Sequence, residues 1–190
     1  PPCEKWSLAC GVKGGNIYWE SIKDKGETIG IKPRENFNVN SKYKILKTPK
    51  KVKEERDFHI NILDKTLDII NFYKPKYYFI ENPRYSRIWD FIENENFKKD
   101  FVIADYCAFG YNYKKPTKIL TNKKLDNVLC KCTGNPKHFM RLGATSKQFL
   151  TERPNIQMPD KTTLLERYSI PQKLLEYLLI KSINLSISNL

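Results

Sequence analysis

The segment 54–83 constrains the fold of this chain more than any other part of the sequence. Apolar residues recur there near a 3.6-residue period, with acidic residues at the front, which predicts a helix over 54–73. Pro75 ends the pattern, because the residue before a proline disfavours the helical conformation. The apolar run 77–80 then predicts a short buried strand that ends at Glu81. A helix, a proline break and an apolar strand in this order favour an α/β sheet.

The other predicted elements are shorter or lie near the C-terminus. Residues 1–12 predict a loop that enters a short helix, and 88–96 predict a second short helix. The apolar run 101–104 predicts a strand, and 118–121 predicts its hairpin partner across a bend rich in Gly and Tyr. A last helix is expected to start at Pro171, a residue suited to the first helical position.

The charge of the chain points to a polyanionic partner. Lys plus Arg number 34 and Asp plus Glu number 21, so the net charge is +13. Nucleic acid is the first candidate partner and an anionic membrane surface the second, while the alternative is a basic surface that only keeps the protein soluble. With 40% hydrophobic residues the chain is not disordered throughout. The apolar tail 174–190 is interrupted by Glu176 and Lys181 and does not predict a membrane span.

Two stretches carry little periodicity. Residues 13–53 contain glycines, prolines and many lysines, which predict an extended loop or insertion, either a simple surface excursion or a loop that contacts DNA. Residues 122–162 are irregular as well. The length of 190 residues allows one ordinary domain, or one domain with a small appendage.

The five cysteines do not predict the even disulfide framework of a small secreted domain, and they favour a reducing compartment. Cys130, Cys132 and His138 lie close enough in sequence to bind Zn²⁺ together. Cys107 is the natural fourth ligand if the predicted hairpin brings it near. The alternative is a set of free thiols in a basic loop with an exposed histidine.

Three short groups of residues contain side chains suited to catalysis or to nucleic-acid binding. Cys3 follows two prolines that stiffen its loop, and in an electropositive pocket its thiolate is a nucleophile; the alternative is a small buried hydrophobe. Residues 81–84 (Glu-Asn-Pro-Arg) end a predicted strand and suit the binding of a heterocycle; the alternative is a turn with a surface ion pair. In 105–118 aromatic residues and lysines interleave, which suits phosphate contact and base stacking; the alternative is a solvated hairpin rim.

In their order along the chain, these groups resemble the DNA cytosine-5 methyltransferases, particularly the divergent branch of phages and large DNA viruses. Residues 1–3 (Pro-Pro-Cys) resemble the proline–cysteine nucleophile loop of that family, and Trp6-Ser7 follows where an aromatic–Ser pair is common. Residues 81–82 resemble its Glu-Asn pair, continued by Pro83-Arg84 as in the viral branch.

The resemblance extends to the C-terminal half. Residues 105–118 resemble the later basic motif, a strand that runs into a hairpin, with Lys115 and Lys118 in place of the arginines of many members. Ile170-Pro171 and the final helix resemble the closing segment of the viral branch. The resemblance covers most of the chain, although each motif is short.

The resemblance implies a fold and a reaction. The chain would be the C-terminal part of a Rossmann-like, S-adenosylmethionine-dependent methyltransferase sheet, with a basic irregular region. It would transfer a methyl group to carbon 5 of a cytosine flipped out of DNA. Cys3 would add to carbon 6, and Glu81 would supply a proton or hydrogen bond at ring nitrogen 3. The residues implied to bind the flipped base or its phosphates are Asn82, Arg84, Lys115, Thr117 and Lys118.

The sequence departs from the family at the cofactor site. The glycine-rich cofactor loop and the acidic ribose-binding residue normally precede the nucleophile loop, where this sequence begins, so we expect a missing N-terminal half or a partner chain to supply that site. The Gly-Asn element that usually precedes the last helix is not evident either. On this interpretation 1–122 is a partial catalytic domain, 123–162 a Cys/His loop region ordered by zinc, and 163–190 a C-terminal helix packed on the catalytic domain.

Two other functions stay open. A non-catalytic basic nucleic-acid-binding module, either a degenerate methyltransferase or a zinc domain, predicts steeply salt-dependent DNA binding with no need for Cys3. An RNA cytosine methyltransferase of related fold would use the same base chemistry. No membrane partner is expected, and the implied setting is intracellular, in the cytoplasm of a bacterium or of an infected host cell.

Overall fold

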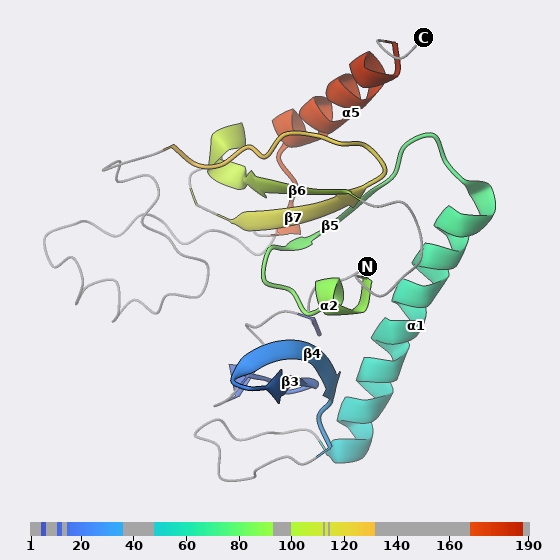
Figure 1. Ribbon diagram of the computed structural model, residues 1–190, viewed down its shortest axis with the longest axis vertical. Helices are drawn as coiled ribbons and strands as arrows, with labels where there is room; N and C mark the ends of the chain where they lie inside the picture. Colours follow the sequence, from blue (N-terminus) through green and yellow to red (C-terminus); the bar gives the residue numbers. More distant parts are fainter. Residues whose placement is uncertain are drawn as a thin grey trace, which may run out of the picture. The chain divides into compact units, whose positions relative to one another are not determined.

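The computed structural model describes residues 5–6, 11–12, 15–35, 48–92, 100–111, 113, 115–131 and 168–187. The chain divides into two compact units, Pro1–Lys98 and Lys99–Leu190. Both units combine helices with antiparallel strand pairs (Figure 1), so the predicted α/β class is confirmed as mixed α/β.

A hairpin in the first unit occupies part of the stretch 13–53, which was predicted to be a loop. β3 (Trp19–Asp24) pairs antiparallel with β4 (Glu27–Pro33). Lys25 and Gly26 form the turn between them with φ angles of 46° and 88°. Two positive φ angles are typical of a type I′ turn, whose twist matches that of the two strands. The prediction of a loop over 13–53 is therefore wrong here, because charged residues on the exposed strands hide the apolar alternation.

A short strand pair begins at the end of the stretch 1–12, for which a loop and a short helix were predicted. β1 (Gly11–Val12) pairs antiparallel with β2 (Gly15–Asn16). Glycine at the start of each strand disfavours a helix, because glycine loses the most backbone freedom on folding. Residues 5–6 and 11–12 are not helical, and the rest of the stretch 1–12 lies outside the described residues.

α1 (Pro49–Tyr73) begins earlier than the predicted Glu54 and ends where predicted. The Thr48 hydroxyl caps it by accepting a hydrogen bond from the Lys51 N–H at 3.3 Å. At the other end Lys74 adopts the left-handed conformation with φ 44° and donates its N–H to the Ile70 carbonyl at 2.9 Å. The start was missed because the first turn is lysine-rich and lacks the apolar period.

The buried stripe of α1 also differs from the predicted one. Phe58 and Ile69, which were expected in the apolar face, are 62% and 58% exposed. The stripe instead includes Arg56 and His59, whose polar character hides the period. The buried residues of α1 are Val52, Arg56, His59, Leu63 and Leu67.

The first unit continues with a strand and a short helix after α1. β5 (Phe79–Pro83) extends further than the predicted run, so Glu81 lies within the strand rather than at its end. α2 (Ile88–Ile92) matches the start of the helix predicted over 88–96, and residues 93–99 lie outside the described part. Three of its five residues are buried, which fixes the segment that follows β5.

The second unit contains the hairpin that the sequence predicts. β6 (Asp100–Asp105) pairs antiparallel with β7 (Pro116–Thr121), with Val102 opposite Ile119. The connection includes the 3₁₀-helix η1 (Tyr106–Phe109). One face of the hairpin is buried, as the alternation of side chains in a strand requires. The buried residues on that face are Val102, Ala104, Thr117, Ile119 and Thr121.

The last helix, α5 (Gln172–Ile187), starts directly after Pro171, so the predicted position is one residue early. Its Leu174 and Leu178 are buried. The Tyr177 hydroxyl donates to the Asp126 carbonyl at 3.0 Å, which fixes the segment after β7 within this unit. Burial raises the pKa of Tyr177 above its ordinary value, and the negative Asp126 carboxylate raises it further. The hydrogen bond to the Asp126 backbone lowers the pKa but does not cancel the increase.

Candidate functional site

The strand β5 presents Glu81 and Asn82 on opposite faces. Ile80 and Asn82 are buried, whereas Glu81 is half-buried on the other face. The Asn82 amide donates to the Glu81 carbonyl at 2.7 Å, and its oxygen accepts from the Ser86 hydroxyl at 3.2 Å. The Asn82 side chain therefore fixes the backbone that carries Glu81.

A tight turn follows β5 and is held from several sides. The Pro83 carbonyl accepts two hydrogen bonds at 2.9 Å, one from the Ser86 N–H and one from the Trp89 indole N–H. Ser86 is buried, and its hydroxyl also accepts from the Ile88 N–H at 3.4 Å. We call residues 83–86 the 83–86 turn; its two central residues, Arg84 and Tyr85, are exposed.

A backbone hydrogen bond joins the N-terminal segment to the segment after this turn. The Arg87 N–H donates to the Trp6 carbonyl at 2.9 Å. The preceding carbonyl, that of Lys5, accepts from the Trp19 indole N–H at 3.2 Å. Two successive carbonyls close after Cys3 in the sequence are therefore held within the first unit. Cys3 itself lies outside the described residues.

Aromatic rings fill the space around this junction. Trp6 and Trp19 are fully buried and stack with centroids 4.9 Å apart and planes 9° apart. Phe91 packs edge-on against both, at 5.1 and 4.9 Å. The Arg56 guanidinium lies 5.8 Å from the Trp19 ring. Such clusters combine a large buried apolar area with favoured ring geometry, so they hold the N-terminal segment firmly.

A second set of contacts positions Lys5. Its ammonium lies 3.8 Å from the Glu55 carboxylate and 5.6 Å from the centre of the Tyr18 ring. The Tyr18 hydroxyl donates to the same carboxylate at 2.7 Å. These contacts fix the ammonium group of Lys5, the residue two positions after Cys3 in the sequence.

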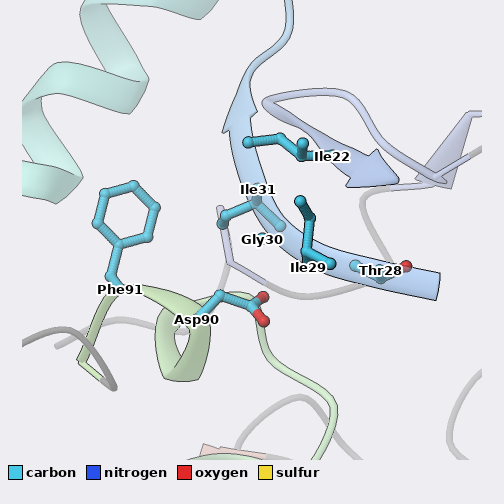
Figure 2. A pocket seen from close by; sticks show the side chains of 7 residues that line it. All are labelled: Ile22, Thr28, Ile29, Gly30, Ile31, Asp90 and Phe91. Atoms are coloured by element: carbon cyan, nitrogen blue, oxygen red, sulfur yellow. The ribbon is translucent and has the colours of Figure 1, made fainter. Parts of the chain in front are cut away.

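A cavity of about 340 Å³ lies between the β3–β4 hairpin and α2. Figure 2 shows isoleucine side chains of the hairpin on one side and Phe91 and Asp90 of α2 on the other. The Asp90 carboxylate lies 3.5 Å from the Arg87 guanidinium, which in turn donates to the Ser21 hydroxyl at 2.7 Å. Apolar side chains thus line part of the cavity, and its acidic group already pairs with a base. Its lining residues are Ile22, Thr28, Ile29, Gly30, Ile31, Asp90 and Phe91.

The candidate lysines of the second unit lie on aromatic rings. The Lys115 ammonium is 4.5 Å from the centre of the Tyr106 ring, and that of Lys118 is 3.8 Å from the Phe101 ring. Lys118 projects from the half-exposed face of the hairpin, opposite to the buried Thr117. Rings under ammonium groups attract the cations electrostatically and so orient them.

Thr117 has a different environment from the two lysines. It is fully buried, and its hydroxyl lies 3.5 Å from the Lys115 carbonyl, within reach of a weak hydrogen bond. Its position in the buried face suits a side chain that fixes the backbone between the two lysines.

The structure brings two of the four predicted zinc ligands onto neighbouring segments. The Asp105 carboxylate accepts a hydrogen bond from the Cys130 N–H at 2.8 Å, and Cys107 follows Asp105 by two residues. Neither cysteine forms a disulfide. Cys132 and His138 lie outside the described residues. Within the described segments no group of three or more candidate ligands is close enough to hold a metal ion, so zinc binding stays a prediction.

Sequence reasoning missed the residues that assemble the first unit. Tyr18 and Trp19 fell in a stretch interpreted as a loop, and Arg87 was not singled out. The signal was available in Trp19 itself, because a tryptophan in a polar segment is more often buried than exposed. The residues next to Trp19 in sequence gave no indication that it packs against Trp6 and Phe91.

Comparison of the chain with family models, with curated proteins and with solved structures found no match. No helix in the described segments is long and apolar enough to cross a membrane.

Proposed function

We propose that this chain is the nucleophile-bearing, DNA-facing part of a DNA cytosine-5 methyltransferase with a Rossmann-like catalytic sheet. The observation that carries the proposal is the hydrogen bond from the Arg87 N–H to the Trp6 carbonyl. It joins Trp6, three residues after Cys3 in the sequence, to Arg87, six residues after Glu81, although the two are far apart in sequence. A reaction that needs a thiol and a carboxyl group at one base requires such a junction.

In the proposed reaction, the Cys3 thiolate forms a bond from its sulfur to carbon 6 of cytosine. The electron pair of the carbon 5–carbon 6 double bond moves toward carbon 5, and negative charge develops on the ring. Glu81 stabilises that charge by a proton or hydrogen bond at nitrogen 3. The half-buried position of Glu81, on a strand whose backbone Asn82 fixes, suits this role.

Cations of both units would bind the DNA backbone. Arg84 is exposed at the 83–86 turn, and Lys115 and Lys118 rest on aromatic rings. Each cation that meets a phosphate releases a counterion and strengthens binding at low salt. The buried Thr117 would position the two lysines rather than touch the base.

S-adenosylmethionine would supply the methyl group. The described residues include no glycine-rich loop at a helix N-terminus, and in the cavity beside α2 the acidic side chain, that of Asp90, is already paired with Arg87. The described residues therefore do not fit the methyl donor, and the proposed chemistry concerns the cytosine alone.

Zinc is proposed separately, as a structural ion bound by Cys107, Cys130, Cys132 and His138. The support is the contact between Asp105 and the Cys130 N–H, which brings the segments of the first two ligands together. Stoichiometric zinc in protein purified without chelators is the expected result, and its absence from such a preparation would contradict the proposal.

The nucleophile is testable without the methyl donor. In DNA that contains 5-azacytosine, nitrogen replaces carbon 5 and makes carbon 6 more electrophilic. The thiolate adds to carbon 6 and the ring nitrogen takes up a proton, so the adduct accumulates without a methyl donor. We expect the chain to form a complex with this DNA that survives denaturing electrophoresis. Cys3→Ser should abolish the complex, and Glu81→Gln should slow its formation about 100-fold or more, as the loss of a general acid does.

Cys10→Ser is the matched control, because it removes the other cysteine of the N-terminal segment. This variant should trap DNA like the wild type. A Cys3→Ser variant that still traps DNA would overturn the proposal and favour the non-catalytic nucleic-acid-binding module. A complex with 5-azacytosine RNA but not with DNA would move the proposal to an RNA substrate.

A further inference from the structure

The 83–86 turn exposes an aromatic ring that the proposed reaction does not use. Tyr85 is 64% exposed, although Asn82 before the turn and Ser86 at its end are buried. The Arg84 guanidinium lies 5.5 Å from the centre of the Tyr85 ring. One guanidinium covers at most one face of a ring, so much of the aromatic surface remains open to solvent.

The turn that carries this ring is rigid. The Pro83 carbonyl holds both the Ser86 N–H and the Trp89 indole, and the Asn82 amide oxygen holds the Ser86 hydroxyl. Tyr85 itself takes no part in these hydrogen bonds. A large aromatic side chain held out on a fixed turn loses little further backbone entropy when it binds a partner.

We propose that Arg84 and Tyr85 form a stacking site for an unstacked DNA base, the arginine covering one side of the tyrosine and the base the other. Every base has a π-face, and aromatic stacking with a nearby cation binds it without regard to sequence. The assignment of DNA as the partner rests on the proposed function, because removing a cytosine from the duplex exposes the faces of the bases beside it. The base comes either from a single strand or from an unpaired position in a duplex.

The chemistry around Tyr85 favours a nucleic acid over an apolar partner. The other exposed ring pair of this unit, Phe72 and Tyr73 at the end of α1, are 79% and 72% exposed and pack edge-on against each other at 4.9 Å. In that pair each ring packs against another ring, whereas the Tyr85 ring lies beside a guanidinium that can also bind a phosphate. Tyr73 is therefore the matched control for an exposed tyrosine of the same unit.

The test compares two oligonucleotides with the same backbone charge. One is a short thymine single strand, and the other is an abasic strand of equal length. We expect the full chain to prefer the thymine strand and Tyr85→Ala to lower that preference about 5- to 100-fold, the range for stacking of one base. Tyr85→Phe should keep the preference, and Tyr73→Ala should leave it unchanged. A fully paired duplex and one with a bulged thymine then separate the two sources of the base.

Salt dependence separates the two side chains. Tyr85→Ala should leave the slope of log affinity against log salt unchanged, whereas Arg84→Gln should reduce it by about 0.7, the value for one phosphate contact on a single strand. A Tyr85→Ala variant that is folded, by its thermal unfolding, and prefers the thymine strand as the wild type does would overturn the inference. So would an equal loss of preference in Tyr73→Ala.

Failure of this inference and failure of the proposed function give different results. If Tyr85→Ala keeps the base preference while the wild type forms the Cys3 adduct, only the stacking site is wrong. If the wild type forms no adduct but Tyr85→Ala loses the base preference, the stacking site stands and the methyltransferase assignment fails.

Discussion

The two hairpins of this protein are held together by different forces. In the second unit, β6 and β7 bury an alternating face that includes Val102 and Ile119. In the first unit, β3 and β4 are exposed along most of their length, and Ile29 is 65% exposed. That hairpin depends on its turn and on the anchor at its open end, where Trp19 is buried and the Arg34 N–H donates to the Tyr18 carbonyl at 3.1 Å. In the second unit the face opposite the buried one carries Lys118. In the first unit the exposed hairpin lines one side of the cavity beside α2.

Core truncation should show the largest difference between the hairpins. Ile119→Ala should lower the free energy of unfolding by about 2–5 kcal/mol, because Ile119 is 1% exposed and its loss leaves a cavity. Ile22→Ala in β3 should cost less than about 1 kcal/mol, since Ile22 is 38% exposed.

The unfolding of the first unit can be distinguished from the unfolding of the whole chain. All three tryptophans lie in the first unit, so their fluorescence reports its unfolding, and far-ultraviolet circular dichroism reports both units. Equal costs for the two substitutions would show that the exposed hairpin has a core of its own.

The turn of the β3–β4 hairpin should matter next most. Gly26→Ala should cost about 1–2 kcal/mol, because a residue with a side chain is strained at φ 88°. No atom lies within 4 Å of the added methyl group, so the cost is conformational and not steric. Gly30→Ala is the control, because its added carbon meets only an ordinary contact at 3.7 Å from Ile22 and its φ is not positive. Urea unfolding followed by tryptophan fluorescence should separate the two variants, and equal costs would contradict the role of the turn.

Lysines on the two hairpins should differ in DNA binding. Lys118→Gln should weaken duplex binding several-fold and lower the salt slope by about 0.9, the value for one phosphate contact. Lys32→Gln should change little, since the Lys32 ammonium already pairs with the Glu20 carboxylate at 3.1 Å. Binding isotherms at several salt concentrations measure both slopes. A larger loss for Lys32→Gln would move the interface to the exposed hairpin.

The smallest effect concerns the helix that packs beside the second hairpin. Because the pKa of Tyr177 is raised in the folded state, the folded chain holds that proton more tightly than the unfolded chain. This contribution to stability is complete below the unfolded pKa of about 10 and is lost as the pH rises through the folded value. Wild-type stability should therefore fall more steeply above that pH than the stability of Tyr177→Phe. Parallel curves would show that Tyr177 does not contribute.

The same contrast explains which elements the sequence could predict. The β6–β7 hairpin was predicted because the apolar run 101–104 and its partner 118–121 reflect largely buried strands. The β3–β4 hairpin was missed because its strands are exposed and its turn is Lys-Gly rather than the stronger Asn-Gly signal. α1 was predicted, but its buried face includes Arg56 and His59, which no hydrophobic pattern identifies.

The candidate site was predictable only in its local parts. Glu81 and Asn82 stand together in the sequence, and their place at the end of an apolar run was readable. The contact of Trp6 with Arg87 is long-range, and it depends on the packing of Trp19 and Phe91 around Trp6. Tertiary packing of this kind leaves no periodic signal in either segment.

The central claim is that Cys3 is the nucleophile, and peptide mapping of the 5-azacytosine complex tests it most directly. Trypsin cleavage after Lys and Arg places each of the five cysteines on its own peptide, and the one with Cys3 ends at Lys5. We expect mass spectrometry to find the nucleotide on that peptide alone. A nucleotide on the peptide of Cys10, Cys107, Cys130 or Cys132, or on none, would contradict the account.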